Sequence, residues 1–135
     1  MSEKNSQATF CATLVDEWIR LGLTDVVVCP GSRSTPFALA FAHRKELRLH
    51  IRLDERSAGF VALGLARELG TPVAVLVTSG TAVSELHAAV CEADLSAIPL
   101  MVVSADRPPE LQGVGAPQTM NQEQIFGTAV RSFIN

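Results

Sequence analysis

Two hydrophobic periods alternate along the chain. Over residues 8–22, apolar side chains such as Phe10, Leu14 and Trp18 recur at spacings of three and four, which predicts an amphipathic helix. Residues 25–29 are instead a continuous run of mostly β-branched residues that ends at a Pro-Gly pair, which is typical of a buried strand. This part of the chain therefore predicts a helix followed by a strand.

The same alternation continues along the rest of the chain. Apolar runs predict further strands at residues 47–53, 72–77, 99–104 and 130–135. Helical spacing predicts further helices at residues 34–45, 56–69 and 81–95, with a short one at 122–128. The prolines and glycines of residues 106–118 predict a long loop.

This order of elements predicts an α/β fold with a mostly parallel sheet and helices on both faces. The apolar runs are largely continuous rather than alternating, as is typical of strands covered on both sides. In such sheets, ligands bind outside the carboxyl ends of the strands. Polar clusters, some containing glycine, follow the predicted strands at residues 30–36, 54–56, 78–81 and 104–110. A binding site is therefore expected at this edge of the sheet.

The composition limits what this site can bind. The chain has 135 residues, of which 47% are hydrophobic and 19% charged, which suffices for one domain with a sizeable core. Its formal net charge is −3 and its pI is about 5.5, so we expect no nucleic-acid partner. An anionic ligand would need a few placed arginines rather than a basic surface.

The cysteines and the apolar segments indicate a cellular location. Cys11, Cys29 and Cys91 are widely spaced, which fits neither a disulfide framework nor a zinc site, so a reduced, cytoplasmic compartment is expected. The histidines share no metal-ligand spacing, and no metal ligand is predicted in the chain. We expect no signal peptide and no membrane insertion, because the first residues are polar and the apolar run at 97–103 is short.

The first polar cluster, at residues 30–36, follows a strand and opens a helix. Backbone N–H groups at a helix start attract anions, and Ser32 and Arg33 add a hydroxyl and a guanidinium that suit a carboxylate or a phosphate. The alternative is a simple helix N-cap with Arg33 in solvent. The local pattern fits both interpretations equally.

The next two clusters are also ambiguous. An acidic pair at a strand-to-helix junction, such as Asp54 and Glu55, caps the helix or supplies a general acid or base, and the pattern favours the cap. Gly80 between Ser79 and Thr81 would let a flat ligand approach the backbone, but an ordinary turn fits this tripeptide better.

The fourth cluster carries a second arginine. Two prolines stiffen the loop that presents Arg107, which either pairs locally with Asp106 or Glu110 or faces the cleft. Cys29 ends an apolar strand, so a buried structural cysteine is favoured over a nucleophile at this position.

The clusters together resemble one enzyme family. PGSRSTP, LDER, TSGTA, SADRPPEL and GAPQ occur in this order, and the resemblance covers roughly residues 8–134. The chain resembles the N-terminal, pyrimidine-binding domain of thiamine-diphosphate enzymes, and specifically that of the SEPHCHC synthases of menaquinone and phylloquinone biosynthesis. Each motif alone is weak, but their joint occurrence is specific.

The resemblance implies a transferase that works with thiamine diphosphate and Mg²⁺. In this family, 2-oxoglutarate adds to the cofactor and loses carbon dioxide, and the four-carbon unit then adds to isochorismate. A separate diphosphate-binding domain with a GDG-type motif holds the metal and the diphosphate, and that motif does not occur in this sequence. Residues 1–135 are therefore expected to be an incomplete pyrimidine-binding domain of a homo-oligomer, either a dimer or a tetramer. The alternative is a stand-alone module that binds small carboxylates without catalysis.

The resemblance also implies roles for single residues on the cofactor side. Glu55 matches the catalytic glutamate that hydrogen-bonds the cofactor's aminopyrimidine ring, which leaves Asp54 a structural role. Gly80 and Thr81 match the segment beside that ring. Gln118 matches a glutamine near the reacting centre.

On the substrate side, Ser32, Arg33 and Arg107 match positions that hold the acidic second substrate. Two guanidiniums suit a dicarboxylate such as isochorismate. One departure is visible, because many members of the family have asparagine where this chain has Pro117. A role of that side chain is not transferred.

Overall fold

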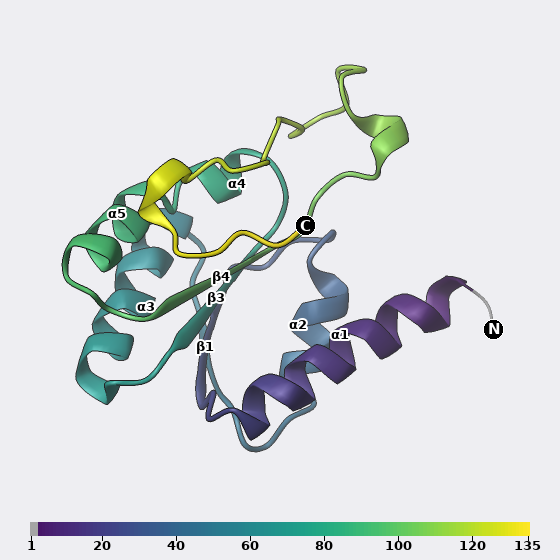
Figure 1. Ribbon diagram of the computed structural model, residues 1–135. Helices are drawn as coiled ribbons and strands as arrows, with labels where there is room; N and C mark the ends of the chain where they lie inside the picture. Colours follow the sequence, from purple (N-terminus) through teal and green to yellow (C-terminus); the bar gives the residue numbers. More distant parts are fainter. Residues whose placement is uncertain (1–2) are drawn as a thin grey trace.

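The computed structural model describes residues 3–135, with side chains from residue 6. Helices and strands alternate along the chain as the sequence predicts (Figure 1). The elements are α1 (Glu3–Arg20), β1 (Asp25–Val28), α2 (Thr35–Ala42), β2 (Arg48–Ile51), α3 (Glu55–Leu69), β3 (Val73–Val77), α4 (Thr81–Ser84), α5 (His87–Leu95), β4 (Leu100–Ser104) and the short 3₁₀ helices η1 (Pro109–Leu111) and η2 (Gly127–Ala129).

The four strands form one parallel sheet in the order β2-β1-β3-β4. The central strands β1 and β3 are buried at every residue, as their continuous apolar runs predict. Strand β2 lies at the edge, where its first and last residues, Arg48 and Ile51, are exposed. The predicted α/β class and the parallel arrangement are confirmed.

Helices cover both faces of the sheet (Figure 1). Successive strand residues point to opposite faces, so Val27 packs with the alanines of α3 while Val26 packs with Val15 of α1 and Phe41 of α2. On the α1 and α2 side, the ring of Phe37 stacks on Trp18 at a centroid distance of 5.8 Å. Each face thus has its own apolar core.

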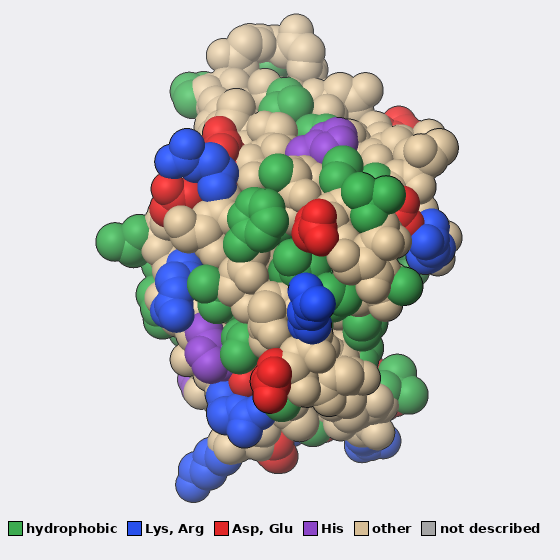
Figure 2. Space-filling model, turned by 90° about the vertical axis from the view of Figure 1, so that its left-hand side faces the viewer, with side chains coloured by type: hydrophobic (Ala, Val, Ile, Leu, Met, Phe, Trp, Pro, Cys, Tyr) green, Lys and Arg blue, Asp and Glu red, His purple; other side chains and the backbone are tan. Residues whose placement is uncertain are grey.

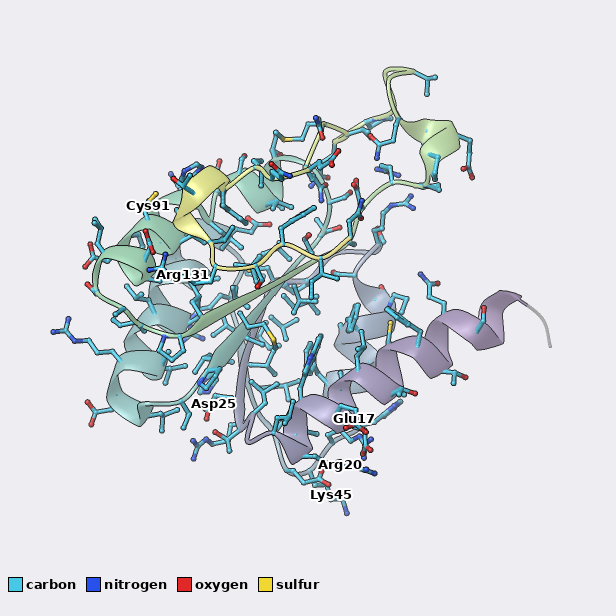
Figure 3. The ribbon with its side chains drawn as sticks, viewed as in Figure 1. Glu17, Arg20, Asp25, Lys45, Cys91 and Arg131 are labelled. Carbon is cyan, nitrogen blue, oxygen red and sulfur yellow. The ribbon has the colours of Figure 1, made fainter. Side chains whose placement is uncertain are left out.

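The predicted fifth strand at residues 130–135 is wrong. This segment is irregular, and the predicted helix at 122–128 is reduced to turns and the single 3₁₀ turn η2. Phe126 is buried in the core on the α5 side, and Arg131 forms an ion pair with Asp94 of α5 (Figure 3). These contacts hold the segment against α5 rather than in line with β4.

One further element differs from the expected one. The predicted helix at 81–95 is interrupted, so that α4 and α5 are separate helices with the fully buried Leu86 at the break.

On the face shown in Figure 2, Lys and Arg side chains are scattered among acidic and hydrophobic ones rather than gathered in one patch. Within residues 3–135, no helix is long and apolar enough to cross a membrane.

The parallel arrangement brings the polar segments that follow the strands to one edge. Gly31, after β1, lies against Thr78, after β3: a Cβ at Gly31 would be 2.5 Å from Thr78 Cβ. Ala105, after β4, accepts a hydrogen bond from the side chain of Gln122. The expected gathering of these segments is therefore confirmed.

Candidate active site

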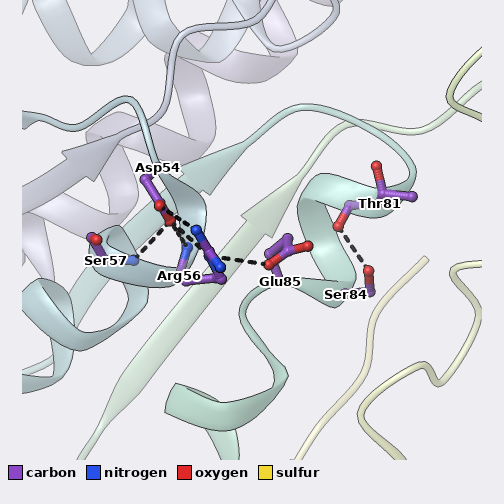
Figure 4. A network of polar contacts seen from close by, with 6 residues as sticks. All are labelled: Asp54, Arg56, Ser57, Thr81, Ser84 and Glu85. Carbon is purple, nitrogen blue, oxygen red and sulfur yellow. Dashed lines mark hydrogen bonds and ion pairs between the residues drawn. The ribbon is translucent and has the colours of Figure 1, made fainter.

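Asp54 is the N-cap of α3. Its Oδ1 accepts hydrogen bonds from the backbone N–H groups of Arg56 at 2.9 Å and Ser57 at 3.2 Å. The Arg56 guanidinium also donates to both carboxylate oxygens, and these bonds are the main cause that lowers the pKa of Asp54 to about 2 (Figure 4). The expected structural role of Asp54 is confirmed.

Glu55, the first residue of α3, differs from its neighbour. Its carboxylate is partly exposed and has no hydrogen-bond or ion-pair partner among the described residues. Glu85, the C-cap of α4, is instead paired with Arg56, at an Nε–Oε2 distance of 3.5 Å (Figure 4). Of these acidic groups beside α3, Glu55 is therefore the one available to a ligand.

Glu55 lines an open groove of about 540 Å³ between α3, α4 and the segment around Gln118. Its lining consists of Leu53, Asp54, Glu55, Arg56, Thr81, Ala82, Glu85 and Gln118. Three of the predicted site residues, Glu55, Thr81 and Gln118, are thus brought together.

Gly80 forms the turn between β3 and α4. Its backbone φ of 75° and ψ of −132° lie in a region that L side chains avoid, and a Cβ there would collide with the carbonyl oxygen of Gln118. Its N–H donates to the side-chain Oε1 of Gln122. Glycine is therefore required both by the turn and by the close approach of the chain.

Gln118 crosses over this turn. Its side-chain Nε2 donates to the carbonyl oxygen of Ser79 at 3.1 Å, and its own backbone φ is 53°, in the left-handed region. Left-handed residues other than glycine are uncommon, and they concentrate at functional sites. The backbone thus holds Gln118 in a specific position beside the groove.

Arg33 lies in the loop between β1 and α2. The buried Ser34 occupies the N-cap position of α2, but its hydroxyl donates to the carbonyl oxygen of Gly31 at 3.1 Å and makes no capping bond. Arg33 is half-buried, and its Nε is buried without a hydrogen-bond partner in the described structure. Neither half of the simple alternative, a side-chain cap with Arg33 in solvent, is found.

Arg107 is held by the chain that follows it. Its Nη2 donates to the carbonyl oxygen of Pro117 at 2.8 Å, and its Nε is buried without a partner in the part that the structure describes. Within the same residues, its guanidinium forms no ion pair with Asp106 or Glu110, so the first of the two alternatives, local pairing, is not found. A buried N–H that lacks an acceptor is costly, and a bound anion would satisfy it.

The structure does not bring all predicted residues to one place. Ser32, Arg33 and Arg107 lie at the same sheet edge, but they are outside the lining of the groove. Ser32 is exposed. The predicted residues thus divide into a cofactor-side group at the groove and a substrate-side group outside its lining.

Cys29 directly follows β1 at this edge. Its side chain is 1% exposed, and burial, together with the nearby carboxylates of Glu55 and Asp54, raises the pKa of the thiol to about 11. A thiol that stays protonated is a poor nucleophile. The expected structural role of Cys29 is confirmed.

One residue of this edge, Gln122, was not predicted from the sequence. Gln122 is 7% exposed and bridges Gly80 to Ala105. No motif includes it, and its polar side chain in a segment predicted as a short helix gives no signal of this bridge.

Across the described chain, no group of three or more His, Cys, Asp or Glu side chains is placed to hold a metal ion.

A parallel sheet with a glycine turn, an unpaired glutamate and a groove at its carboxyl edge defines a ligand-binding α/β domain. The chain belongs to the family described as "Thiamine pyrophosphate enzyme, N-terminal TPP binding domain", whose profile matches residues 9–125. The resemblance stated from the motifs is therefore confirmed at the level of the family.

Relatives point to a particular enzyme. The chain is 55% identical over 129 residues to the 2-succinyl-5-enolpyruvyl-6-hydroxy-3-cyclohexene-1-carboxylate synthase of Thermobifida fusca (strain YX). The matched region covers 96% of this chain and 23% of that protein. The synthases of the same name from Chloroflexus aurantiacus and Bacillus velezensis are 61% and 51% identical, over 84% and 92% of this chain and 19% and 22% of their own lengths. The chain thus spans about a quarter or less of the length of each of these relatives.

Proposed function

We propose that the chain supplies the pyrimidine-binding part of a SEPHCHC synthase, the enzyme for which its relatives are named. The reaction is a transfer in which 2-oxoglutarate loses carbon dioxide and its four-carbon remainder joins isochorismate. The observation that carries this proposal is the Glu55 carboxylate, which lines the groove without a partner among the described residues.

The described residues fit thiamine diphosphate. The free Glu55 carboxylate is a suitable acceptor for a ring N–H, and Thr81 and Gln118 line the same groove beside it. When bound, the cofactor supplies the carbon centre at which 2-oxoglutarate is decarboxylated. The Mg²⁺, together with the diphosphate that it binds, is assigned to a separate domain, because the described chain offers the metal no cluster of acidic ligands.

Each residue of the chain then has a task. Glu55 accepts a hydrogen bond from the pyrimidine ring and holds a proton at that ring nitrogen. Arg33 and Arg107, with their buried Nε groups, bind the carboxylates of isochorismate, and the hydroxyl of Ser32 adds a donor. Gln118 orients the reacting groups by its side-chain amide, which already contacts the turn at Ser79.

The proposal includes the setting of the enzyme. The site is completed by the diphosphate-binding domain of another subunit in a dimer or tetramer, and the enzyme acts in the cytoplasm in menaquinone or phylloquinone biosynthesis. A second candidate, a stand-alone module for small carboxylates, is supported by the two unpaired arginine Nε groups.

Substitution of Glu55 tests the proposal. In the protein made from its complete reading frame, we expect Glu55→Gln to lower turnover by about 10²- to 10⁴-fold, because the ring nitrogen loses its charged acceptor. Glu46→Gln is the matched control, since Glu46 is exposed in the loop before β2, away from the site. The measurements are carbon dioxide release from 2-oxoglutarate and the melting temperature, which should not change. Decarboxylation at the wild-type rate in Glu55→Gln would contradict the proposal.

A further inference from the structure

Gln122 is a buried amide with two backbone partners from distant parts of the chain. Its Oε1 accepts the N–H of Gly80, and its Nε2 donates to the carbonyl oxygen of Ala105 at 3.0 Å. Its side chain is 7% exposed, so water does not replace these bonds readily. Both ends of the amide are matched by groups of the opposite kind, which fixes its orientation.

The two partners belong to the two groups of site residues. Gly80 precedes Thr81, which lines the groove beside Glu55. Ala105 follows β4 and lies two residues before Arg107. The Gln122 amide is therefore a direct link between the cofactor-side turn and the loop that carries the substrate-side arginine.

Other bonds from the same segment are weaker constraints. Gln118 contacts Ser79, and Pro117 accepts from Arg107, but both Gln118 and Pro117 are exposed. Exposed polar contacts exchange with water at little cost, whereas a buried one does not. The relative position of the Gly80 turn and the Arg107 loop thus depends most on Gln122.

We propose that Gln122 is a positioning residue that sets the distance between the Gly80 turn and the Arg107 loop. It thereby aligns isochorismate with the cofactor without touching either molecule. This inference rests on the proposed function for its ligands. The geometry of the link itself does not depend on that function.

Gln122→Met tests the link, because methionine keeps the length of the side chain and removes both hydrogen bonds. Hydrogen exchange resolved to the Gly80 amide should accelerate by about five-fold or more, as expected for loss of one net hydrogen bond, while the amides of β1 and β3 keep their protection. Gln124→Met is the matched control, since Gln124 is exposed in the same segment. Faster exchange throughout the sheet, or unchanged exchange at Gly80, would overturn the proposal.

Gln122→Glu provides a second, independent arm. Above the pKa of the introduced carboxyl, an oxygen without a proton would face the Ala105 carbonyl oxygen, whereas protonation restores a donor at that place. After correction for intrinsic exchange, the loss of protection at Gly80 should therefore shrink as the pH falls. A defect that is independent of pH would count against the bond to Ala105.

Kinetics with the complete protein separate this inference from the proposed function. In Gln122→Met we expect the KM for isochorismate to rise by about five-fold. Carbon dioxide release from 2-oxoglutarate without isochorismate should change by less than about two-fold. An equal loss of both activities would overturn the positioning role. A wild-type protein without synthase activity would instead refute the proposed function, and the exchange result at Gly80 would still decide the link.

Discussion

At the scale of single residues, the site depends on a close approach of backbone to backbone. The Gly80 turn lies against the carbonyl group of Gln118, and there is no room for a Cβ between them. Gly64, in the middle of α3, is exposed and a Cβ there would meet no atom within 4 Å. The two glycines therefore offer opposite environments for the same substitution.

We expect Gly80→Ala to lower the free energy of unfolding by about 1–3 kcal/mol, because its φ of 75° disfavours alanine and the Gln118 segment must move. Gly64→Ala should raise it by up to about 1 kcal/mol, because alanine is the better helix former. Urea denaturation of both variants measures the difference. Equal effects of the two substitutions would show that the contact with Gln118 carries no weight.

The arginines make a second prediction at this scale. Arg33→Ala or Arg107→Ala in the complete protein should raise the KM for isochorismate about ten- to a hundred-fold, because a charge-assisted hydrogen bond is lost. The KM for 2-oxoglutarate should change less. Steady-state kinetics with each substrate varied in turn measures both, and unchanged isochorismate kinetics would exclude these arginines from the acceptor site.

At the scale of elements, β1 and β2 are joined by a buried carboxylate at the end of the sheet away from the site. Asp25, labelled in Figure 3, opens β1 in register with Arg48 of β2. Its side chain is 1% exposed. Its carboxylate accepts two bonds from Arg48, at 2.6 and 3.0 Å, and others from His50 and Thr24 at 2.8 Å. The bonds from Arg48 are the first cause that holds the pKa of Asp25 well below its usual range.

This lowered pKa makes stability depend on pH. The folded chain keeps Asp25 ionised where the unfolded chain binds a proton, so the stabilisation is complete above about pH 4 and declines as the pH falls below it. We expect Asp25→Asn to lower the free energy of unfolding at pH 7 by about 1.5–3 kcal/mol, with a smaller difference at pH 3. Urea denaturation at several pH values, with the exposed Glu68→Gln as control, measures this. A difference that does not depend on pH would contradict the assignment.

The elements were predictable where a physical pattern marks them. β1 and β3 are covered on both faces, so their apolar runs identify them without ambiguity. The segment at residues 130–135 also contains Val130, Phe133 and Ile134, but a strand also needs an available sheet edge in the right place. The burial of Phe126 and the ion pair of Arg131 with Asp94 hold this segment elsewhere, and no local pattern reveals such contacts.

At the scale of the whole molecule, the candidate site was only partly predictable. The order of elements places the polar clusters at one sheet edge, but it does not separate Glu55 from Asp54. That distinction depends on the side-chain bonds of Arg56, which engage Asp54 and not Glu55. The link made by Gln122 spans 42 residues of sequence to Gly80, and a contact of this kind follows from the fold rather than from any local motif.

The proposed division of the site between domains also makes a prediction at this scale. Isothermal titration of the 135-residue chain with isochorismate or 2-oxoglutarate should give no submillimolar binding, because the chain supplies only part of the groove. Submillimolar binding that is lost in Arg107→Ala would favour the stand-alone module instead. The same titration with the complete protein is the positive control.

The left-handed backbone at Gln118 bears on how variants of this protein should be selected. A non-glycine residue in that conformation costs about 1–2 kcal/mol, so a library ranked by thermal resistance alone would favour glycine at this position. The same change removes the amide that contacts Ser79 beside the groove. Selection for thermal stability would therefore favour glycine at residue 118, whereas selection for turnover would favour glutamine. A library built for thermal stability should keep Gln118 unchanged.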